Sequence, residues 1–558
     1  MNFRKNIYIL LNMSKKPIIF FVFFFIFFYS CKPMKEKVDL LVISGHIYSV
    51  DSAERIFESM AIKDGKILKL GTTDEILNRY SAKDTLNVKG ENIFPGFIDA
   101  HCHFVGLAKN LQYVDLTGSG SFEEVIDRVK SFKSVLPGGW IVGRGWDQNL
   151  WTSKQFPDKQ ILDKTFPNQP VILIRIDGHV VLANEVALNE ARIEKNQIFN
   201  LDEVKFKDGE LTGILCENAA DYIRSIVPIP IDECMIELLT RAETLCFSYG
   251  LTGVSDAGLD YKTIRFIDVF QKQKKIKISV YAMLELSNEN ISFFVKNGPY
   301  QTNSLTVRSL KIYADGSLGS RTALLKKNYS DDTSKCGILV TPIDSLRELC
   351  RLALENNYQV NTHAIGDSAN KIVLEIYSSF LNGKNDKRWR IEHAQVIDLN
   401  DIHLFGDYSI IPSIQATHAT SDMKWAKDRV GAERIKGAYA YKTLLEQNGW
   451  LPNGTDFPIE NPSPILSFYA AVSRQDIFGK PESGFEKDNA LTRDQALKSI
   501  TIWAAKANFW EKNKGSLEPG KSADFIILDK DIMKIPISEI PDVKVEKTFL
   551  GGECVYYR

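Results

Sequence analysis

Histidine is rare in this sequence, and neither sign of charge is in excess. Only eight of the 558 residues are histidine, and 69 basic residues nearly balance 70 acidic ones, for a formal net charge of -1. A nucleic-acid partner is not expected, since proteins that bind nucleic acids concentrate positive charge, and no long basic run follows residue 40. The scarcity of histidine gives weight to its positions, because most of the eight fall within a few short motifs.

Paired cysteines are also lacking. Seven of the eight cysteines lie after residue 40, with no CxxC pair and no regular spacing. This odd, scattered set argues against a disulfide framework, and most of its members are expected to be small buried apolar side chains.

The first 31 residues differ from the rest of the chain. Basic residues precede an apolar run over residues 18–28, which ends in Tyr29-Ser30-Cys31. A basic stretch followed by about 7–15 apolar residues is typical of a secretory signal, whereas a membrane-spanning helix needs about 20. A small residue before a cysteine, followed by polar residues 32–37, resembles a bacterial lipoprotein signal. We therefore expect export and a membrane anchor through acylated Cys31; an uncleaved anchor or an ordinary secretory signal are the alternatives.

The two ends of the mature chain both have β patterns. Residues 38–50 and 61–71 form strand-like runs, the second around Asp64-Gly65, which is a strong two-residue hairpin signal. Residues 515–521 have turn chemistry, and strand-like segments follow up to residue 558, with a Gly551-Gly552 turn between the last two. We expect one small β-sandwich domain built from residues 38–92 and 512–558.

Between these ends, apolar strand-like runs alternate with helical stretches, which predicts parallel βα units. Eight candidate strands fit a closed TIM-type (β/α)₈ barrel over residues 93–511. The candidate strands lie at residues 92–101, 251–258, 277–284, 309–317, 358–366, 389–395, 408–418 and 449–457. The gap from His103 to Thr252 is too long for one unit. It predicts an insertion over about residues 105–245, expected to cover the barrel mouth.

The strongest local motif is Pro-Gly-Phe-Ile-Asp-Ala-His-Cys-His at residues 95–103. Residues two apart on a strand project from the same face, so His101 and His103 can both reach one ion. Neutral imidazoles suit zinc and other borderline divalent metals. We predict that both are metal ligands, although an HxH pair alone is a weak signal.

Three more candidates close later strand patterns. His363 and His393 each end a strand just before a turn or helix, and Asp456 follows the last candidate strand. A barrel brings the carboxyl ends of all its strands to one rim, so we predict that all three bind metal and that Asp456 is also the general base. Hydrogen-bonded packing of the histidines, or an Asx-turn at Asp456, are the structural alternatives.

Together, the motifs at residues 95–103, 362–367, 390–395 and 453–458 resemble the amidohydrolase superfamily. The segments at residues 175–184, 309–323 and 413–422 narrow this resemblance to amidohydrolase family 3, the YtcJ-like branch that includes N-substituted formamide deformylases. The resemblance implies a TIM barrel with a composite β-sandwich domain, one or two divalent ions, with zinc expected, and hydrolysis of a C–N bond or a related electrophile in a small molecule.

Lys311 occupies the place where many relatives in that superfamily carry a lysine carbamate that bridges two metals. Carbamylation needs an unprotonated amine, hence a lowered lysine pKa. The alternative is a lysine that contacts only substrate or a carboxylate.

A further set of residues is predicted to lie at the substrate site. His418 is a candidate donor to the developing oxyanion, with core packing as the alternative. The candidates for substrate contact are His179, Glu217, Trp146 and Asp147, with Trp151 beside them; packing or surface roles are the alternatives.

The sequence therefore predicts a metal-dependent hydrolase in which a metal-activated water attacks a carbonyl and Asp456 takes its proton. Two other functions stay open: a lipoprotein that captures a ligand in a metal-lined barrel, and an isomerase or deacetylase on the same scaffold. Oligomeric state has no readable signal in the sequence.

Overall fold

The computed structural model describes residues 34–176, 180–193, 203–228 and 232–558. The predicted signal segment with Cys31, and His179, lie outside these residues. Within the described ranges, no helix is both long and apolar enough to span a membrane.

A parallel barrel forms the centre of the molecule. Seven strands pair side by side in chain order, each parallel to the next. They are β8 (Phe97–Cys102), β15 (Leu251–Leu259), β16 (Ser279–Leu284), β18 (Leu305–Tyr313), β19 (Gln359–Ala364), β20 (Arg390–His393) and β21 (Ile411–Ser413). The short β17 (Tyr300–Gln301) pairs antiparallel with β18.

An extended segment closes this barrel between β21 and β8. Asn453 pairs in parallel with Ile414, just after β21, and the Gly454 N–H donates to the Ile414 carbonyl at 2.9 Å. On the other side, the Asp456 N–H donates to the carbonyl of His101 at 2.8 Å. The segment thus takes the eighth strand position, and the predicted TIM-type barrel is confirmed.

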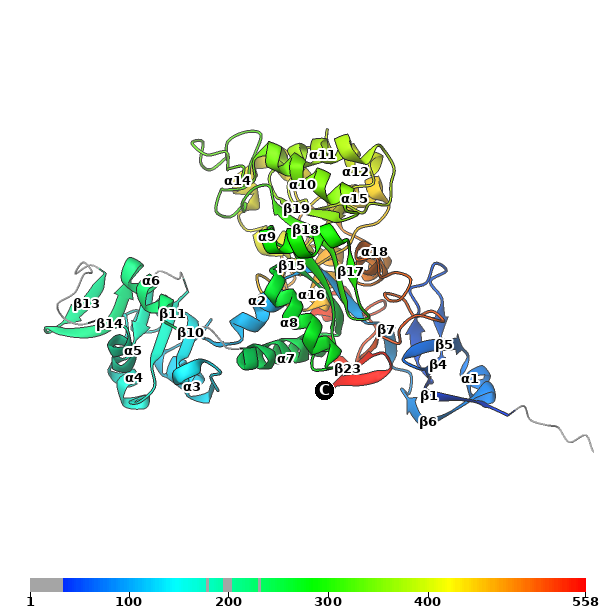
Figure 1. Cartoon of the computed structure of the whole chain (residues 1–558), viewed down its shortest axis with the longest axis horizontal. Helices are drawn as coiled ribbons and strands as arrows, with labels where there is room; N and C mark the ends of the chain where they lie inside the picture. Colours follow the sequence, from blue (N-terminus) through cyan, green and yellow to red (C-terminus); the bar gives the residue numbers. More distant parts are fainter. Residues whose placement is uncertain (1–33, 177–179, 194–202, 229–231) are drawn as a thin grey trace, which may run out of the picture.

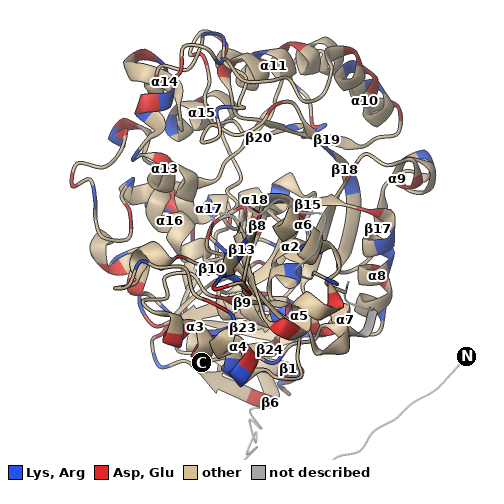
Figure 2. Ribbon diagram, turned by 90° about the vertical axis from the view of Figure 1, so that its left-hand side faces the viewer, with Lys and Arg blue, Asp and Glu red and all other residues tan. Residues whose placement is uncertain are grey.

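Helices surround the strands, as Figure 2 shows for the ring of helices outside β15, β18, β19 and β20. The side chain of Asp260 caps α8 by accepting from the Thr263 N–H, and Ile264 and Ile267 on that helix are buried. The helices of this part are α2 (Phe104–Asn110), α7 (Asp232–Ser248), α8 (Tyr261–Lys272), α9 (Asn288–Phe293), α10 (Ile343–Glu355), α11 (Asp367–Leu381), α12 (His403–Asp407), α13 (Ala416–Asp422), α14 (Ala426–Arg434), α15 (Tyr441–Asn448), α16 (Pro464–Ser473), α17 (Arg493–Ser499) and α18 (Ile502–Ala507).

The two chain ends share a β-sandwich, as predicted. One sheet has the order β5-β4-β1-β6 and the other β24-β23-β22-β7-β2-β3. The strands are β1 (Glu36–Ile43), β2 (His46–Tyr48), β3 (Ile56–Phe57), β4 (Ser59–Lys63), β5 (Lys66–Gly71), β6 (Tyr80–Asn87), β7 (Asn92–Pro95), β22 (Phe525–Leu528), β23 (Val545–Leu550) and β24 (Glu553–Tyr557), with α1 (Thr73–Arg79) between β5 and β6. One apolar core joins Val42 and Met60 to Ile527 and Phe549.

The predicted insertion after the first barrel strand forms a sheet of its own, in the order β13-β14-β12-β11-β10-β9. Its elements are β9 (Tyr113–Asp115), α3 (Phe122–Ser131), β10 (Ile141–Trp146), α4 (Gln160–Thr165), β11 (Val171–Arg175), β12 (Val180–Ala183), α5 (Glu185–Glu190), β13 (Val204–Lys207), β14 (Glu210–Cys216) and α6 (Glu217–Ser225). In Figure 1 this sheet stands apart from the barrel strands, beyond α2 and α7. Its expected place over the barrel mouth stays a prediction.

Candidate metal centre

Seven of the side chains that the sequence singles out meet at the carboxyl ends of the barrel strands. They are His101 on β8, His103 at the start of α2, Lys311 on β18, His363 on β19, His393 at the end of β20, His418 on α13 and Asp456 in the closing segment. Residues from almost the whole barrel are gathered here because parallel strands all end at the same rim.

Asp456 lies at the centre of this cluster. Its Oδ1 is 3.2 Å from His103 Nε2 and 3.6 Å from His101 Nε2, and its Oδ2 is 3.6 Å from His418 Nε2. Two triads, each able to hold a metal ion, share this carboxylate: one adds His101 and His103, the other His393 and His418. In each triad the candidate ligand atoms lie within 4.8 Å of one another.

The His393 ring lies close to two other histidine rings of the cluster. The centroid of the His393 ring is 4.9 Å from that of His101 and 4.5 Å from that of His363. His363 Nε2 is 3.1 Å from the Gly316 carbonyl oxygen. His363 therefore lies beside the cluster, with this nitrogen close to a backbone acceptor.

Besides the types of side chain present, one further observation fits the binding of a divalent metal ion at this cluster. His393 Nδ1 is buried and has no hydrogen-bond partner among the described residues, although buried polar atoms are nearly always satisfied. The backbone is also held in the left-handed region at His393 (φ 73°) and Asp456 (φ 61°). Non-glycine residues adopt this conformation at a cost, and such strain is concentrated at functional sites.

Burial keeps several of the imidazoles neutral. It lowers the pKa of His363 to about 3, with the charge of Lys311 adding to the effect. The pKa of His393 is likewise held well below its ordinary value by burial and by the neighbouring His363. Neutral imidazole is the form that binds metal.

The central carboxylate is held ionised. Burial alone would raise the pKa of Asp456, but the hydrogen bond to His103 and the charges of His101 and His418 outweigh it, so the pKa lies well below its ordinary value. An ionised carboxylate in this position can bind a cation and can accept a proton.

Lys311 has the environment expected for a modified lysine. It is fully buried, its Nζ is 3.5 Å from His101 Nε2, and it lies 4.9 Å from the centroid of the Tyr313 ring. Burial lowers the pKa of its amine to about 8. Carbamylation requires an unprotonated amine, and the lowered pKa makes that form more available near neutral pH.

Two buried carboxylates at the cluster were not predicted from the sequence. Glu392 accepts a hydrogen bond from His101 Nδ1 at 2.6 Å. Asp315 accepts from the backbone N–H groups of Ile365 and Gly366 at 2.9 and 2.8 Å, beside His363. The signal for Glu392 was its place next to His393 on a buried strand, where an acidic side chain needs a partner.

The structure does not bring Trp146 and Asp147 to the histidines. Trp146 is buried in the core of the inserted sheet, stacks on Trp151, and donates its indole N–H to the Leu173 carbonyl at 2.8 Å. Asp147 forms an ion pair with Arg175 at 2.9 Å. The backbone of Glu217 begins α6 in the same insertion.

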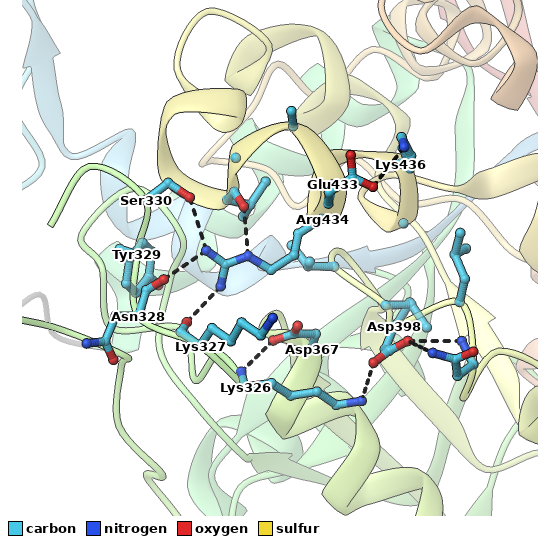
Figure 3. A pocket seen from close by; sticks show the side chains of 18 of the residues that line it. Lys326, Lys327, Asn328, Tyr329, Ser330, Asp367, Asp398, Glu433, Arg434 and Lys436 are labelled. Atoms are coloured by element: carbon cyan, nitrogen blue, oxygen red, sulfur yellow. Dashed lines mark hydrogen bonds and ion pairs between the residues drawn. The ribbon is translucent and has the colours of Figure 1, made fainter. Parts of the chain in front are cut away.

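A cavity of about 1150 Å³ lies away from the histidines, between the loop after β18 and helix α14 (Figure 3). The Arg434 guanidinium donates to the carbonyls of Lys327 and Asn328, and Lys326 pairs with Asp398. These charged groups already have partners in the wall itself, and none of the cluster residues lines the cavity. The chemistry thus points to the histidine cluster rather than to this cavity.

Known proteins are similar to this chain over nearly its whole length. The family model described as "Amidohydrolase family" matches residues 84–556. The YtcJ protein of Bacillus subtilis (strain 168) is 32% identical over 92% of this chain and 98% of its own length. The N-substituted formamide deformylase of Arthrobacter pascens is 24% identical over 94% of this chain and 99% of its own length.

A solved structure shows the same architecture. The crystal structure of an uncharacterized metal-dependent hydrolase from Pyrococcus horikoshii OT3 is 30% identical, has a TM-score of 0.73, and covers 89% of this chain and 99% of its own.

Proposed function

This chain belongs to the amidohydrolase family, and from that premise we propose that it cleaves a carbon–nitrogen bond, of amide or formamide type, in a small molecule. The observation that carries the proposal is the convergence of imidazoles on Asp456 at the barrel mouth, with His393 Nδ1 buried and without a partner among the described residues. The full-length similarity to an N-substituted formamide deformylase supports the choice of bond.

We propose zinc as the ion, since neutral imidazoles and a carboxylate are ligands that suit it. His101, His103, His393 and Asp456 would hold it, with His363 beside them and Lys311 as a bridge if a second ion is present. A bound divalent ion would lower the pKa of a coordinated water and polarise a carbonyl group.

Asp456 is the proposed general base. Its carboxylate is ionised and lies within 3.6 Å of three histidines, so it faces the centre of the cluster. From this position it can accept the proton of an attacking water and deliver it to the leaving nitrogen, which must be protonated to depart as an amine.

His418 is the proposed donor to the developing oxyanion. Its Nε2 is buried, has no hydrogen-bond partner among the described residues, and lies 3.6 Å from Asp456 Oδ2. Its ring is nearly parallel to that of His393, with centroids 5.9 Å apart. A preorganised donor stabilises charge that appears only in the transition state.

The test is the metal content of the purified protein, with turnover of a panel of N-substituted formamides and amides before and after chelation. We expect bound zinc, loss of turnover on chelation, and recovery on zinc addition. Protein that takes up no metal would overturn the proposal. Protein that binds metal and panel compounds without turning any over would favour the ligand-binding lipoprotein instead.

We also propose that the enzyme acts outside the cytoplasm on a lipid anchor at Cys31, on the basis of the signal-like sequence alone. The test is labelling of the expressed protein with a fatty-acid analogue, together with detergent-phase partition. We expect label in the parent and none in Cys31→Ser; equal labelling of the two proteins would overturn the proposal.

A further inference from the structure

A buried carboxylate reaches across the barrel interior to the first of the metal-site histidines. Glu392 lies on β20 and His101 on β8, and the closing segment and β21 separate these two strands. Both side chains are almost completely buried, and Glu392 Oε2 is 2.6 Å from His101 Nδ1. Such a short contact between buried groups is a strong, charge-assisted hydrogen bond.

Arg390 lies near the other oxygen of this carboxylate, which has no hydrogen-bond partner among the described residues. It precedes Glu392 by two residues on the same strand and therefore projects to the same side; its Nη1 is 3.9 Å from Glu392 Oε1. The same guanidinium donates to the carbonyl of Ala100 at 3.1 Å and to Asn508 Oδ1 at 2.6 Å. Arg390 thus balances the buried charge of Glu392 and contacts the backbone immediately before His101.

The geometry determines which nitrogen of His101 faces the cluster. Nδ1 is occupied by Glu392, so it carries the proton, and Nε2 is left with its lone pair. That Nε2 lies 3.6 Å from Asp456 Oδ1 and 3.5 Å from Lys311 Nζ, at the centre of the cluster. The opposite tautomer would present an N–H to the cation and would repel it.

We propose that Glu392, supported by Arg390, is a positioning residue that sets the tautomer and the ring orientation of His101 for metal binding. The inference rests on the proposed metal-dependent function and deepens it. Hydrogen-bond partners of metal-binding histidines typically contribute about 10–100-fold to metal affinity.

A purely structural ion pair between Glu392 and Arg390 is the competing explanation, so the test measures metal affinity as well as stability. The zinc affinity of the full-length apo-protein is measured by competition with a chromophoric chelator, for the parent and for Glu392→Gln, which has nearly the same shape. Glu243→Gln is the matched control. Glu243 is also a buried carboxylate, but it accepts the backbone N–H groups of Lys277 and Ile278 and is not part of the histidine cluster.

We expect Glu392→Gln to bind zinc about 10–100-fold more weakly, and Glu243→Gln to bind it like the parent. In a His101→Asn background, the further change Glu392→Gln should alter affinity less than about twofold, because its effect passes through His101. Thermal unfolding of each apo-protein is followed in parallel.

Three results would overturn the inference: parent-like zinc affinity in Glu392→Gln, an equal loss in Glu243→Gln, or failure of Glu392→Gln to fold. The last would make the carboxylate a structural partner of Arg390. If the parent itself binds no zinc, the proposed function fails and the positioning role fails with it. If the parent binds zinc and Glu392→Gln binds it equally well, only the positioning role fails.

Discussion

At the scale of single residues, a substitution can separate the two roles that we propose for Asp456, metal ligand and general base. Asparagine has nearly the same shape and keeps an oxygen that can bind metal, but it accepts a proton poorly. We expect Asp456→Asn to retain metal and to lose turnover by roughly 10²–10⁴-fold, the usual contribution of general acid–base catalysis. Metal analysis and kcat on one substrate check this; turnover close to that of the parent would mean that another group takes the proton.

Lys311 is the residue on which the number of ions depends. If its amine is carbamylated, the native mass exceeds the sequence mass by one carbon dioxide, which acid releases. We then expect Lys311→Met to lower the metal content from about two ions per chain to about one, as for a lost bridge in a two-metal site. Native mass spectrometry and metal analysis check both. An unmodified mass together with about one ion in the parent would leave Lys311 as a contact residue.

Some members of the cluster are easier to predict from the sequence than others. His101, His103, His363, His393 and Asp456 follow from the rarity of histidine and from strand ends that share a rim. Glu392 does not, because its partner His101 lies 291 residues away and no local pattern shows which neighbour a buried acid faces. For the residues assigned to the insertion, no pattern in the sequence shows which side chains reach the site, and Trp146 is in fact packed inside its sheet.

At the scale of elements, Glu243 links helix α7 to the strand that it covers. Its Oε1 accepts the N–H groups of Lys277 and Ile278, just before β16. Glu243→Ala leaves two backbone donors unpaired, one of them buried, and we expect a loss of roughly 2–6 kcal/mol in the free energy of unfolding, at about 1–3 kcal/mol for each group. Denaturant unfolding checks the loss. A change below about 0.5 kcal/mol would show that water replaces the carboxylate.

Glu243 should also make the stability of the folded protein depend on pH. Burial raises the pKa of Glu243 above its ordinary value of 4.5, against the opposing backbone hydrogen bonds. Because the folded state then binds the proton more tightly than the unfolded chain, ionisation costs stability as pH rises above 4.5. Glu243→Gln lacks this ionisation. We therefore expect its stability to increase relative to that of the parent as pH rises from acid to neutral. Unfolding curves of both proteins across that range decide it, and a gain toward acid pH would contradict the assignment.

Local elements were easier to predict than long-range pairings. The hairpin at Asp64-Gly65 forms between β4 and β5, with positive φ at both residues, as Asp-Gly turns favour. The barrel followed from alternation and length. The sheet of the insertion did not, because its order β13-β14-β12-β11-β10-β9 mixes parallel and antiparallel neighbours and no periodicity in the sequence specifies such an order.

At the scale of the whole molecule, the two chain ends depend on each other. Strand β22 pairs with β7, and Phe525 and Ile527 pack in the core formed by the N-terminal strands. Strand β8, which carries His101, begins two residues after the end of β7. Removal of residues 523–558 should therefore expose that core and disturb the start of the barrel. We expect insoluble or unfolded protein, measured by soluble yield and circular dichroism; a soluble truncated protein with normal zinc binding would show that the barrel stands alone.

The closing segment of the barrel has a consequence for when the protein can bind its metal during synthesis and export. Asp456 follows His101 by more than half of the chain's length, so no ribosome-bound fragment that ends before the eighth strand position carries both proposed ligands. If the chain crosses a membrane unfolded, as its leader-like sequence suggests, the ion must be acquired on the far side. The metal bound by the enzyme would then depend on the ions available outside the cytoplasm rather than on those inside it.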